Sequence, residues 1–198
     1  MTRAGAALRR AWGEFVGPEA TPANHALTAL VTAAGAVAAP WVARAGGADT
    51  SRAAVACLLA VDLAGGAYVN NTRACARWYE RPGQGDAAHY GFAALHVHPA
   101  AVAWLDARPS ASGADRRVRP VAWAAAQYGY LMAATLVIRR LRSRRRVLGV
   151  VLTTGGLVLD AALGPSPTAP WFAWTYYPKL LLGHAAAALW SDADLTGP

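Results

Sequence analysis

Five ionisable side chains lie near the middle of long apolar stretches of this sequence, and they are the groups best placed to do chemistry. They are Asp62, His96, His98, Lys179 and His184. An ionisable group at the depth of a lipid bilayer is costly, so such groups usually face a partner or a pathway inside a helical bundle. We therefore expect these side chains to line one polar site within the membrane.

Asp62 belongs to a polar seam within the apolar stretch 53–71. Asp62, Gly66 and Asn70 are spaced four residues apart, which places all three on one face of a helix. Gly65 and Gly66 would let a neighbouring helix approach that face closely. The spacing therefore predicts a helix that turns a carboxylate and an amide toward partners elsewhere in the bundle.

The two histidines of the next apolar stretch need a distorted helix to act together. His96 and His98 are two residues apart, so they would point to roughly opposite sides of a regular helix. Pro99 removes one backbone hydrogen bond and is expected to kink the helix just after His98, leaving a carbonyl near Leu95 free. Both imidazoles could then turn toward one cavity.

One interpretation of these groups is a metal site. Imidazole and carboxylate are suitable zinc ligands, and an open coordination position could hold an activated water molecule. Asp62, His96 and His184 would be the ligands, which would make the protein an intramembrane metal-dependent hydrolase. The sequence contains neither HExxH nor two histidines four residues apart, so no ligand spacing typical of zinc enzymes is present.

Two other interpretations need no metal. Asp62, the histidines and Lys179 could form a proton relay or a path for a small solute, because histidine titrates near neutral pH and a carboxylate at depth can exchange protons with it. Alternatively, Asp62 pairs with Lys179, the histidines donate to backbone carbonyls freed near prolines, and the groups only set the helix register of a structural membrane subunit. Between the active functions, we slightly favour transport or proton relay over hydrolysis.

The loop after the Asp62 stretch is a second candidate site. Arg73 and Arg77 are four residues apart and, with Asn70, are expected to form a cytoplasmic mouth for the polar site. Arg73, Arg77 and Arg81 also form a cationic cluster beside Trp78, at a level where anionic lipid headgroups could bind. The alternative is a basic anchor that only sets the orientation in the membrane.

Composition also favours a membrane protein and argues against two other classes. Hydrophobic residues make up 55% of the 198 residues and charged residues 15%, against roughly 25% charged in soluble proteins. The net charge of +8 comes from short basic blocks between apolar stretches, and no nucleic-acid-binding motif accompanies them, so we expect no nucleic acid partner. Cys57 and Cys75 belong to no CxxC pair, which argues against a zinc ribbon or a disulfide framework.

Six apolar stretches of about 17–21 residues predict the fold. They are 24–43, 53–70, 89–105, 120–138, 147–164 and 171–190. A helix needs about 20 residues to cross about 30 Å of hydrocarbon, and none of the stretches shows the alternating pattern of a barrel strand. The sequence therefore predicts an all-α integral membrane bundle of six transmembrane helices, preceded by a short N-terminal interfacial helix.

The ends of the chain are expected to be cytoplasmic. We divide the sequence into a cytoplasmic interfacial segment at 1–22, a six-helix transmembrane domain at 23–190 and a short cytoplasmic tail at 191–198. This orientation puts 12 arginines in cytoplasmic segments and 6 in outer loops, and we interpret the basic block 139–146 mainly as a determinant of this topology. We therefore expect a multi-pass protein of the cell membrane with both termini in the cytoplasm.

Overall fold

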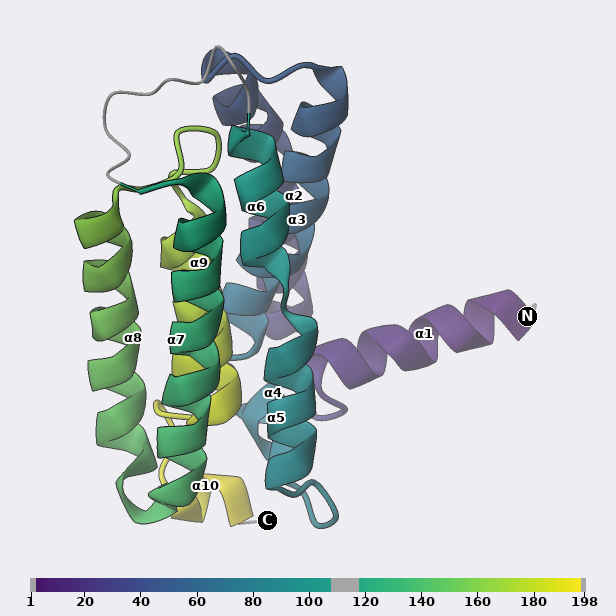
Figure 1. Ribbon diagram of the computed structural model, residues 1–198. Helices are drawn as coiled ribbons and strands as arrows, with labels where there is room; N and C mark the ends of the chain where they lie inside the picture. Colours follow the sequence, from purple (N-terminus) through teal and green to yellow (C-terminus); the bar gives the residue numbers. More distant parts are fainter. Residues whose placement is uncertain (1–2, 108–117, 197–198) are drawn as a thin grey trace.

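The computed structural model describes residues 3–107 and 118–196, and this part of the chain folds into helices without any strand (Figure 1). The α-helices are α1 (Arg3–Val16), α2 (Pro22–Ala45), α3 (Thr50–Val69), α4 (Arg73–Tyr79), α5 (Asp86–Leu95), α6 (His98–Asp106), α7 (Pro120–Arg140), α8 (Arg145–Leu163), α9 (Phe172–Tyr177) and α10 (Asp192–Thr196). A 3₁₀ turn, η1 (Arg142–Arg144), leads into α8, and a π-helix, η2 (Pro178–Ala185), continues α9. The predicted all-α class is therefore confirmed.

Within residues 3–107 and 118–196, four helices are long and apolar enough to cross a membrane. They are α2, α3, α7 and α8 with its leading turn η1. Large apolar side chains remain exposed on their outer faces: Val37 of α2 is 75% exposed and Val121 of α7 is 78% exposed. Such a surface is suited to a lipid environment, because a water-soluble protein rarely exposes so many large apolar side chains to water. These helices support a membrane location.

The other two predicted spans are each divided into shorter helices, so four of the six predicted transmembrane helices are found as long continuous helices. The stretch 89–105 forms α5 and α6, with a break around His96; Pro99 lies in the first turn of α6, where its missing N–H is tolerated. The stretch 171–190 forms α9 and η2, with Pro178 at the junction. Proline cannot donate the hydrogen bond that would continue a regular α-helix.

The core of the bundle surrounds α9 and η2. The α2–α3 pair lies on one side and the α7–α8 pair on the other, and the α9–η2 segment contacts α3, α7 and α8 (Figure 1). Buried aromatic side chains from α7, α9 and their junctions fill this space; they include Trp123, Phe172, Tyr176 and Tyr177. This packing presses one face of α3 against η2, and that contact positions the centre of the candidate site.

Several short segments gather at one end of the bundle. α4 contacts both α1 and α10, and the turn between α7 and α8 lies at the same end (Figure 1). We call the region formed by α4, α10 and residues 139–146 the basic end. α1 projects sideways from the bundle (Figure 1), anchored where Val16 packs against Val69 and Cys75.

Candidate functional site

The carboxylate of Asp62 is the centre of the candidate site. Its Oδ2 atom accepts a hydrogen bond from Lys179 Nζ at 2.5 Å and lies 3.1 Å from His98 Nε2. His96 Nε2 lies 3.9 Å from the same oxygen. Three elements, α3, η2 and the α5–α6 break, therefore bring four of the five predicted site residues around one carboxylate oxygen.

The predicted polar seam of α3 holds Lys179 in place. Gly66 leaves room for the lysine stem, since a Cβ atom at this position would lie 2.5 Å from both Cδ and Cε of Lys179. One turn further on, Asn70 Nδ2 donates to Lys179 O at 3.2 Å. The lysine side chain is only 2% exposed, so its ammonium group depends on Asp62 for a counter-charge. All three residues of the seam therefore contact Lys179.

The break between α5 and α6 turns both imidazoles toward the carboxylate. His96 Nδ1 donates to Phe92 O at 2.6 Å, and Tyr176 Oη donates to His96 O at 2.9 Å. These bonds satisfy backbone carbonyls that a continuous helix would pair internally. The kink was predicted just after His98 but lies around His96, because these partners accommodate the freed carbonyls there.

Hydrogen bonding assigns a proton to one nitrogen of each of these two rings. His96 Nδ1 faces a carbonyl, which can only accept, so this nitrogen carries the proton and Nε2 presents its lone pair toward Asp62. His98 Nε2 carries its proton toward the carboxylate, while His98 Nδ1 is buried with no hydrogen-bond partner among the described residues. Each ring therefore offers one nitrogen that can accept a further proton.

His184 lies apart from the carboxylate, in a group of aromatic side chains. Its imidazole stacks on Phe92 at 3.8 Å between ring centroids and meets Tyr79 edge-on at 4.3 Å. Phe92 also contacts the His96 ring, at 4.4 Å. Both nitrogens of His184 are buried, and neither finds a hydrogen-bond partner in the described part of the chain. The fifth predicted residue is therefore linked to the other four through the Phe92 ring.

The ligands of the hypothetical metal site are not brought together. Phe92 packs against both His96 and His184, which keeps His184 away from Asp62. Within residues 3–107 and 118–196, no three histidine, cysteine, aspartate or glutamate side chains are grouped so that they could hold a metal ion. The geometry therefore gives no support to a metal site built from Asp62, His96 and His184.

His89 is a further buried titratable residue, and it contacts His184. Its Nδ1 donates to His184 O at 3.1 Å, and the two ring centroids are 4.7 Å apart. Its Nε2 lies 3.6 Å from Glu80 Oε1, and the His89 side chain is buried. Sequence reasoning left both His89 and Glu80 out of the site. The available signal was the seven-residue spacing between His89 and His96, which places them on one helix face.

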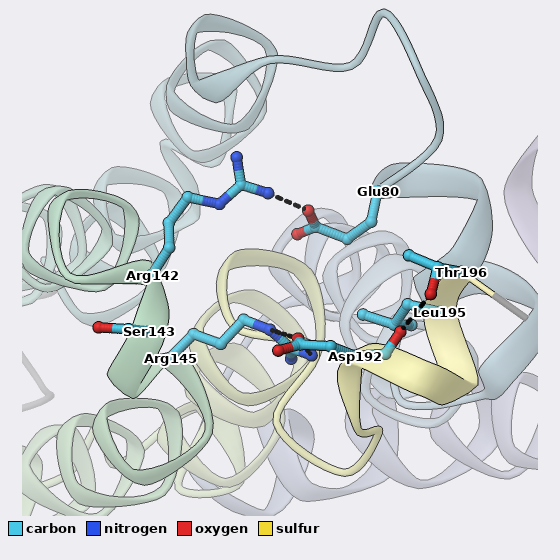
Figure 2. A pocket seen from close by; sticks show the side chains of 7 residues that line it. All are labelled: Glu80, Arg142, Ser143, Arg145, Asp192, Leu195 and Thr196. Carbon is cyan, nitrogen blue, oxygen red and sulfur yellow. Dashed lines mark hydrogen bonds and ion pairs between the residues drawn. The ribbon is translucent and has the colours of Figure 1, made fainter.

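Glu80 connects these histidines to a pocket at the basic end. The pocket has a volume of about 290 Å³, and Glu80, Arg142, Arg145 and Asp192 belong to its lining (Figure 2). Arg142 Nη2 donates to Glu80 Oε2 at 2.9 Å, and the buried Arg139 donates from Nη1 to Glu80 Oε1 at 2.5 Å. The Glu80 carboxylate is thus fixed by two guanidinium groups between the buried histidines and the pocket.

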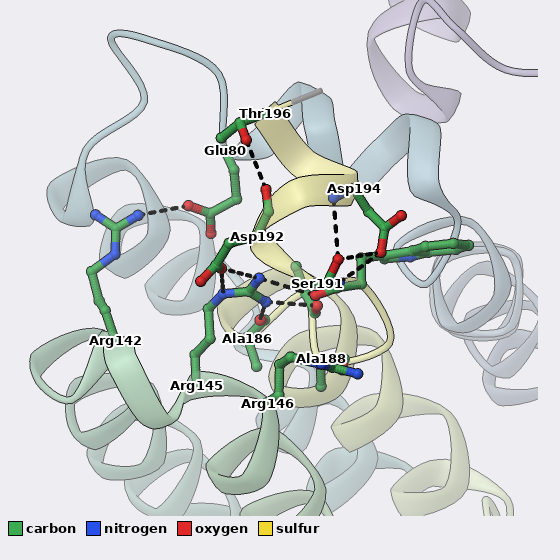
Figure 3. Close-up of polar contacts among 12 residues, drawn as sticks. Glu80, Arg142, Arg145, Arg146, Ala186, Ala188, Ser191, Asp192, Asp194 and Thr196 are labelled. Carbon is green, nitrogen blue, oxygen red and sulfur yellow. Dashed lines mark hydrogen bonds and ion pairs between the residues drawn. The ribbon is translucent and has the colours of Figure 1, made fainter. Parts of the chain in front are cut away.

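Arg145 holds the end of η2, a role that sequence reasoning missed. Its Nη1 donates to Ala186 O at 2.6 Å and to Ala187 O at 2.8 Å, and its Nη2 donates to Asp192 Oδ1 at 2.6 Å (Figure 3). A cation at this position satisfies carbonyls that have no partner within the helix and complements the helix dipole. The block 139–146 therefore contains structural arginines in addition to any that set topology.

The three residues of the predicted mouth each have a different partner. Asn70 is buried and bonded to the backbone of η2. Arg73 Nε donates to Asp194 O at 3.0 Å, whereas Arg77 pairs with Glu19 at 3.3 Å. The polar groups that continue from the site reach the basic end through the histidines instead.

Two side chains of α4, Cys75 and Tyr79, pack near these titratable groups but carry no charge themselves. Burial raises the pKa of the Cys75 thiol to about 12, and burial also raises the pKa of the Tyr79 phenol. Both groups therefore stay protonated at neutral pH. Cys75 Sγ lies 3.6 Å from Phe15 O and from Asn70 Oδ1, which ties α4 to α1 and to the end of α3.

The arrangement is a line of titratable side chains between the middle of α3 and the basic end. It consists of Asp62, His96, His184, His89 and Glu80. Imidazoles in such a line can take up and release protons in turn, and the step between His96 and His184, which the Phe92 ring separates, would need intervening water. The chain matches no model of a known protein family, no curated protein and no solved structure.

Proposed function

We propose that this protein is a membrane protein that carries protons, alone or together with a small solute, along its line of buried titratable groups. The path would run from Asp62 through His96, His184 and His89 to Glu80. Histidine suits this role because its imidazole takes up and releases a proton near neutral pH. Asp62 would exchange the proton at mid-membrane depth, and Glu80 would exchange it with the solvent at the basic end.

The observation that carries this proposal is the state of His184. Its imidazole is buried, and neither nitrogen has a hydrogen-bond partner among the described residues. Leaving a buried polar group unpaired costs roughly 1–3 kcal/mol, and a phenylalanine would fill the same space without that cost. His184 lies one ring away from His96 and in contact with His89. A relay needs a proton acceptor at this position, whereas packing alone does not.

The broken helices also support a transport role. The α5–α6 break and the α9–η2 junction both contribute side chains to Asp62, so the two interruptions lie at the same depth in the bundle. Helices interrupted near the middle of the bilayer are typical of the ion and substrate sites of secondary transporters. A bundle that only supports other proteins gains nothing from interrupting two helices beside a carboxylate.

We further propose that the protein lies in the cell membrane and crosses it six times, with both termini in the cytoplasm. The α5–α6 and α9–η2 segments would add two crossings to the four continuous ones, and α1 would lie on the membrane surface. The positive-inside rule then assigns the basic end to the cytoplasm. Three outer-loop arginines, Arg108, Arg116 and Arg117, lie outside the described residues. A reporter fused to the C-terminus that proves to lie on the outer side of the cell membrane would overturn this orientation.

Proton flux into liposomes tests the proposed path. Purified protein is reconstituted with the pH-sensitive dye pyranine inside, and a potassium gradient with valinomycin supplies the driving potential. We expect wild-type protein to acidify the lumen several-fold faster than empty liposomes, and His184→Phe to remove this increase, because phenylalanine retains the ring but binds no proton. His25→Phe is the matched control, since His25 accepts a hydrogen bond from Trp12 of α1, which projects sideways from the bundle (Figure 1). Equal flux with wild type and His184→Phe would refute the path.

A second candidate function, a structural membrane subunit, is favoured by the Asp62–Lys179 ion pair. The pair, held by Gly66 and Asn70, would fix the register of α3 against η2. Under this alternative, Asp62→Asn lowers stability and there is no flux to lose. Under the relay, Asp62→Asn removes the flux even from molecules that remain folded. His184→Phe also separates the two, because a purely structural core tolerates it or becomes more stable.

A further inference from the structure

A groove beside the basic end combines a cationic residue with an apolar wall. It has a volume of about 620 Å³, and its lining includes Arg73, Asn24, Leu182, Leu189 and Trp190. It lies where α2 begins and α3 ends, which is where two of the helices able to cross a membrane reach the boundary of the bilayer. No acidic residue belongs to its lining within the described part of the chain. Such a groove fits a molecule with an anionic head and an apolar chain.

Arg73 is the cationic residue in the lining of this groove. Its Nε donates to Asp194 O at 3.0 Å, but within the described residues no ion pair joins it to a carboxylate. The Asp194 carboxylate accepts from Ser191 Oγ at 2.6 Å, and its pKa is lowered by the Ser191 hydrogen bonds and, to a smaller extent, by the charge of Arg73. The two Nη groups of Arg73 therefore remain as a planar fork, which matches the oxygens of a phosphate.

The other two arginines of the predicted cationic cluster are already engaged. Arg77 pairs with Glu19 at 3.3 Å. The Arg81 guanidinium lies 3.5 Å from the centroid of the Trp78 ring and donates to Trp78 O. Both arginines line a different groove, to which Glu19 also contributes. The predicted cluster is therefore divided, and Arg73 alone of the three adjoins the wall formed by η2 and the segment after it.

We propose that this groove binds one anionic phospholipid, with its phosphate on Arg73 and an acyl chain along Leu182 and Leu189. Leu189 is 53% exposed, and an acyl chain would cover it. Trp190 donates from Nε1 to Asn71 O at 3.0 Å, which holds its ring at the depth where indole groups favour the membrane boundary. The net charge of +8 adds to the preference for an anionic head. This site does not depend on the proposed proton path.

Lipid binding by the full-length, detergent-purified protein tests the site. The probes are dioleoyl phosphatidylglycerol and dioleoyl phosphatidylcholine, which share their acyl chains and differ in head charge, and bound molecules are counted by native mass spectrometry. We expect one phosphatidylglycerol per chain and weaker binding of phosphatidylcholine. Arg73→Gln should weaken phosphatidylglycerol binding about tenfold, and Arg73→Lys should restore part of it. Arg77→Gln is the matched control and should bind as wild type does.

Several outcomes would overturn the proposal. Equal binding of the two lipids would exclude recognition of the head charge, and an equal loss in Arg73→Gln and Arg77→Gln would place the lipid elsewhere or show only a general charge effect. Soluble glycerol 3-phosphate that displaces the lipid at similar concentration would show that the apolar wall takes no part. As a folding control, Arg73→Gln without added lipid should have the same helix content and melting temperature as wild type. If Arg73→Gln is misfolded, lipid binding is compared between Arg73→Lys and wild type instead.

Discussion

Replacing Gly66 with alanine should displace the ammonium group at the centre of the site. The added Cβ atom would lie 2.5 Å from Cδ and Cε of Lys179 and 3.0 Å from Cγ. Carbon atoms in contact are normally about 3.5–4.0 Å apart, so the lysine stem must move by about 1 Å. The stem is buried and its Nζ lies 2.5 Å from Asp62 Oδ2, so this movement lengthens or breaks the ion pair.

The expected loss of stability follows from two opposing terms. Overpacking a filled core costs about 1–3 kcal/mol, and a buried charge with a displaced partner adds to that cost. Alanine is a better helix former than glycine by about 1 kcal/mol, which offsets part of it. The net destabilisation of Gly66→Ala should therefore be about 1–3 kcal/mol, or a fall of about 2–12 °C in melting temperature for a chain of this size.

Thermal unfolding in one detergent, followed by circular dichroism, measures this effect. Gly129→Ala is the matched control, because a Cβ atom at Gly129 would meet nothing within 4 Å, and its melting temperature should stay the same or rise. In a Lys179→Ala background the clash is absent, so Gly66→Ala should then cost little. If Gly66→Ala and Gly129→Ala melt at the same temperature, the lysine stem does not occupy the position on which the site depends.

Three further perturbations test other parts of the structure. Arg145→Gln should lower the unfolding free energy by about 1–3 kcal/mol, because it removes the donor to Ala186 O and breaks the pair with Asp192, whereas exposed Arg144→Gln should change it by less than about 0.5 kcal/mol in the same denaturant titration. At pH 8 the Cys75 thiol should react with iodoacetamide about a thousandfold more slowly than a thiol of pKa 9.0, since its pKa is about 12, and unfolding should restore the rate. Phe92→Ala removes the ring that contacts two imidazoles of the path, so pyranine should report a several-fold change in proton flux; unchanged flux would argue against a path beside this ring.

The parts of the fold that local sequence controls were predictable. The lengths of the apolar stretches placed the four continuous helices, because a membrane-spanning helix is defined by length and hydropathy. The break around His96 was misplaced because its position depends on a distant residue: the hydroxyl of Tyr176, 80 residues later, satisfies the carbonyl that the break exposes. The same limit applies to η2, whose distortion follows from Pro178 but whose end is fixed by Arg145.

The candidate site was predictable where spacing along one helix determines contact. The interval of four residues between Asp62, Gly66 and Asn70 placed them on one face, and all three contact Lys179. His184 could not be placed in this way, because nothing in the local sequence shows that an aromatic ring from another helix lies between it and the carboxylate. The buried arginines were missed for a different reason: a basic block between two spans is already explained by the positive-inside rule.

The ion pair and the histidine line differ in whether their buried polar atoms have hydrogen-bond partners. This difference favours the relay over a purely structural role for the whole site. The pair is satisfied, since Lys179 Nζ reaches Asp62 and the α3 seam holds the lysine. The line is not: both nitrogens of His184 are buried without hydrogen-bond partners among the described residues, and His89 Nε2, which lies 3.6 Å from Glu80 Oε1, also makes no hydrogen bond there. At roughly 1–3 kcal/mol each, these three atoms would cost about 3–9 kcal/mol, which is comparable with the whole stability of a typical domain of about 5–15 kcal/mol. A purely structural core would replace these rings with apolar ones, whereas a relay requires nitrogens that are open to a proton in transit. Replacing one of these imidazoles with an apolar ring, as in His184→Phe, should therefore end the proposed transport while making the folded protein no less stable.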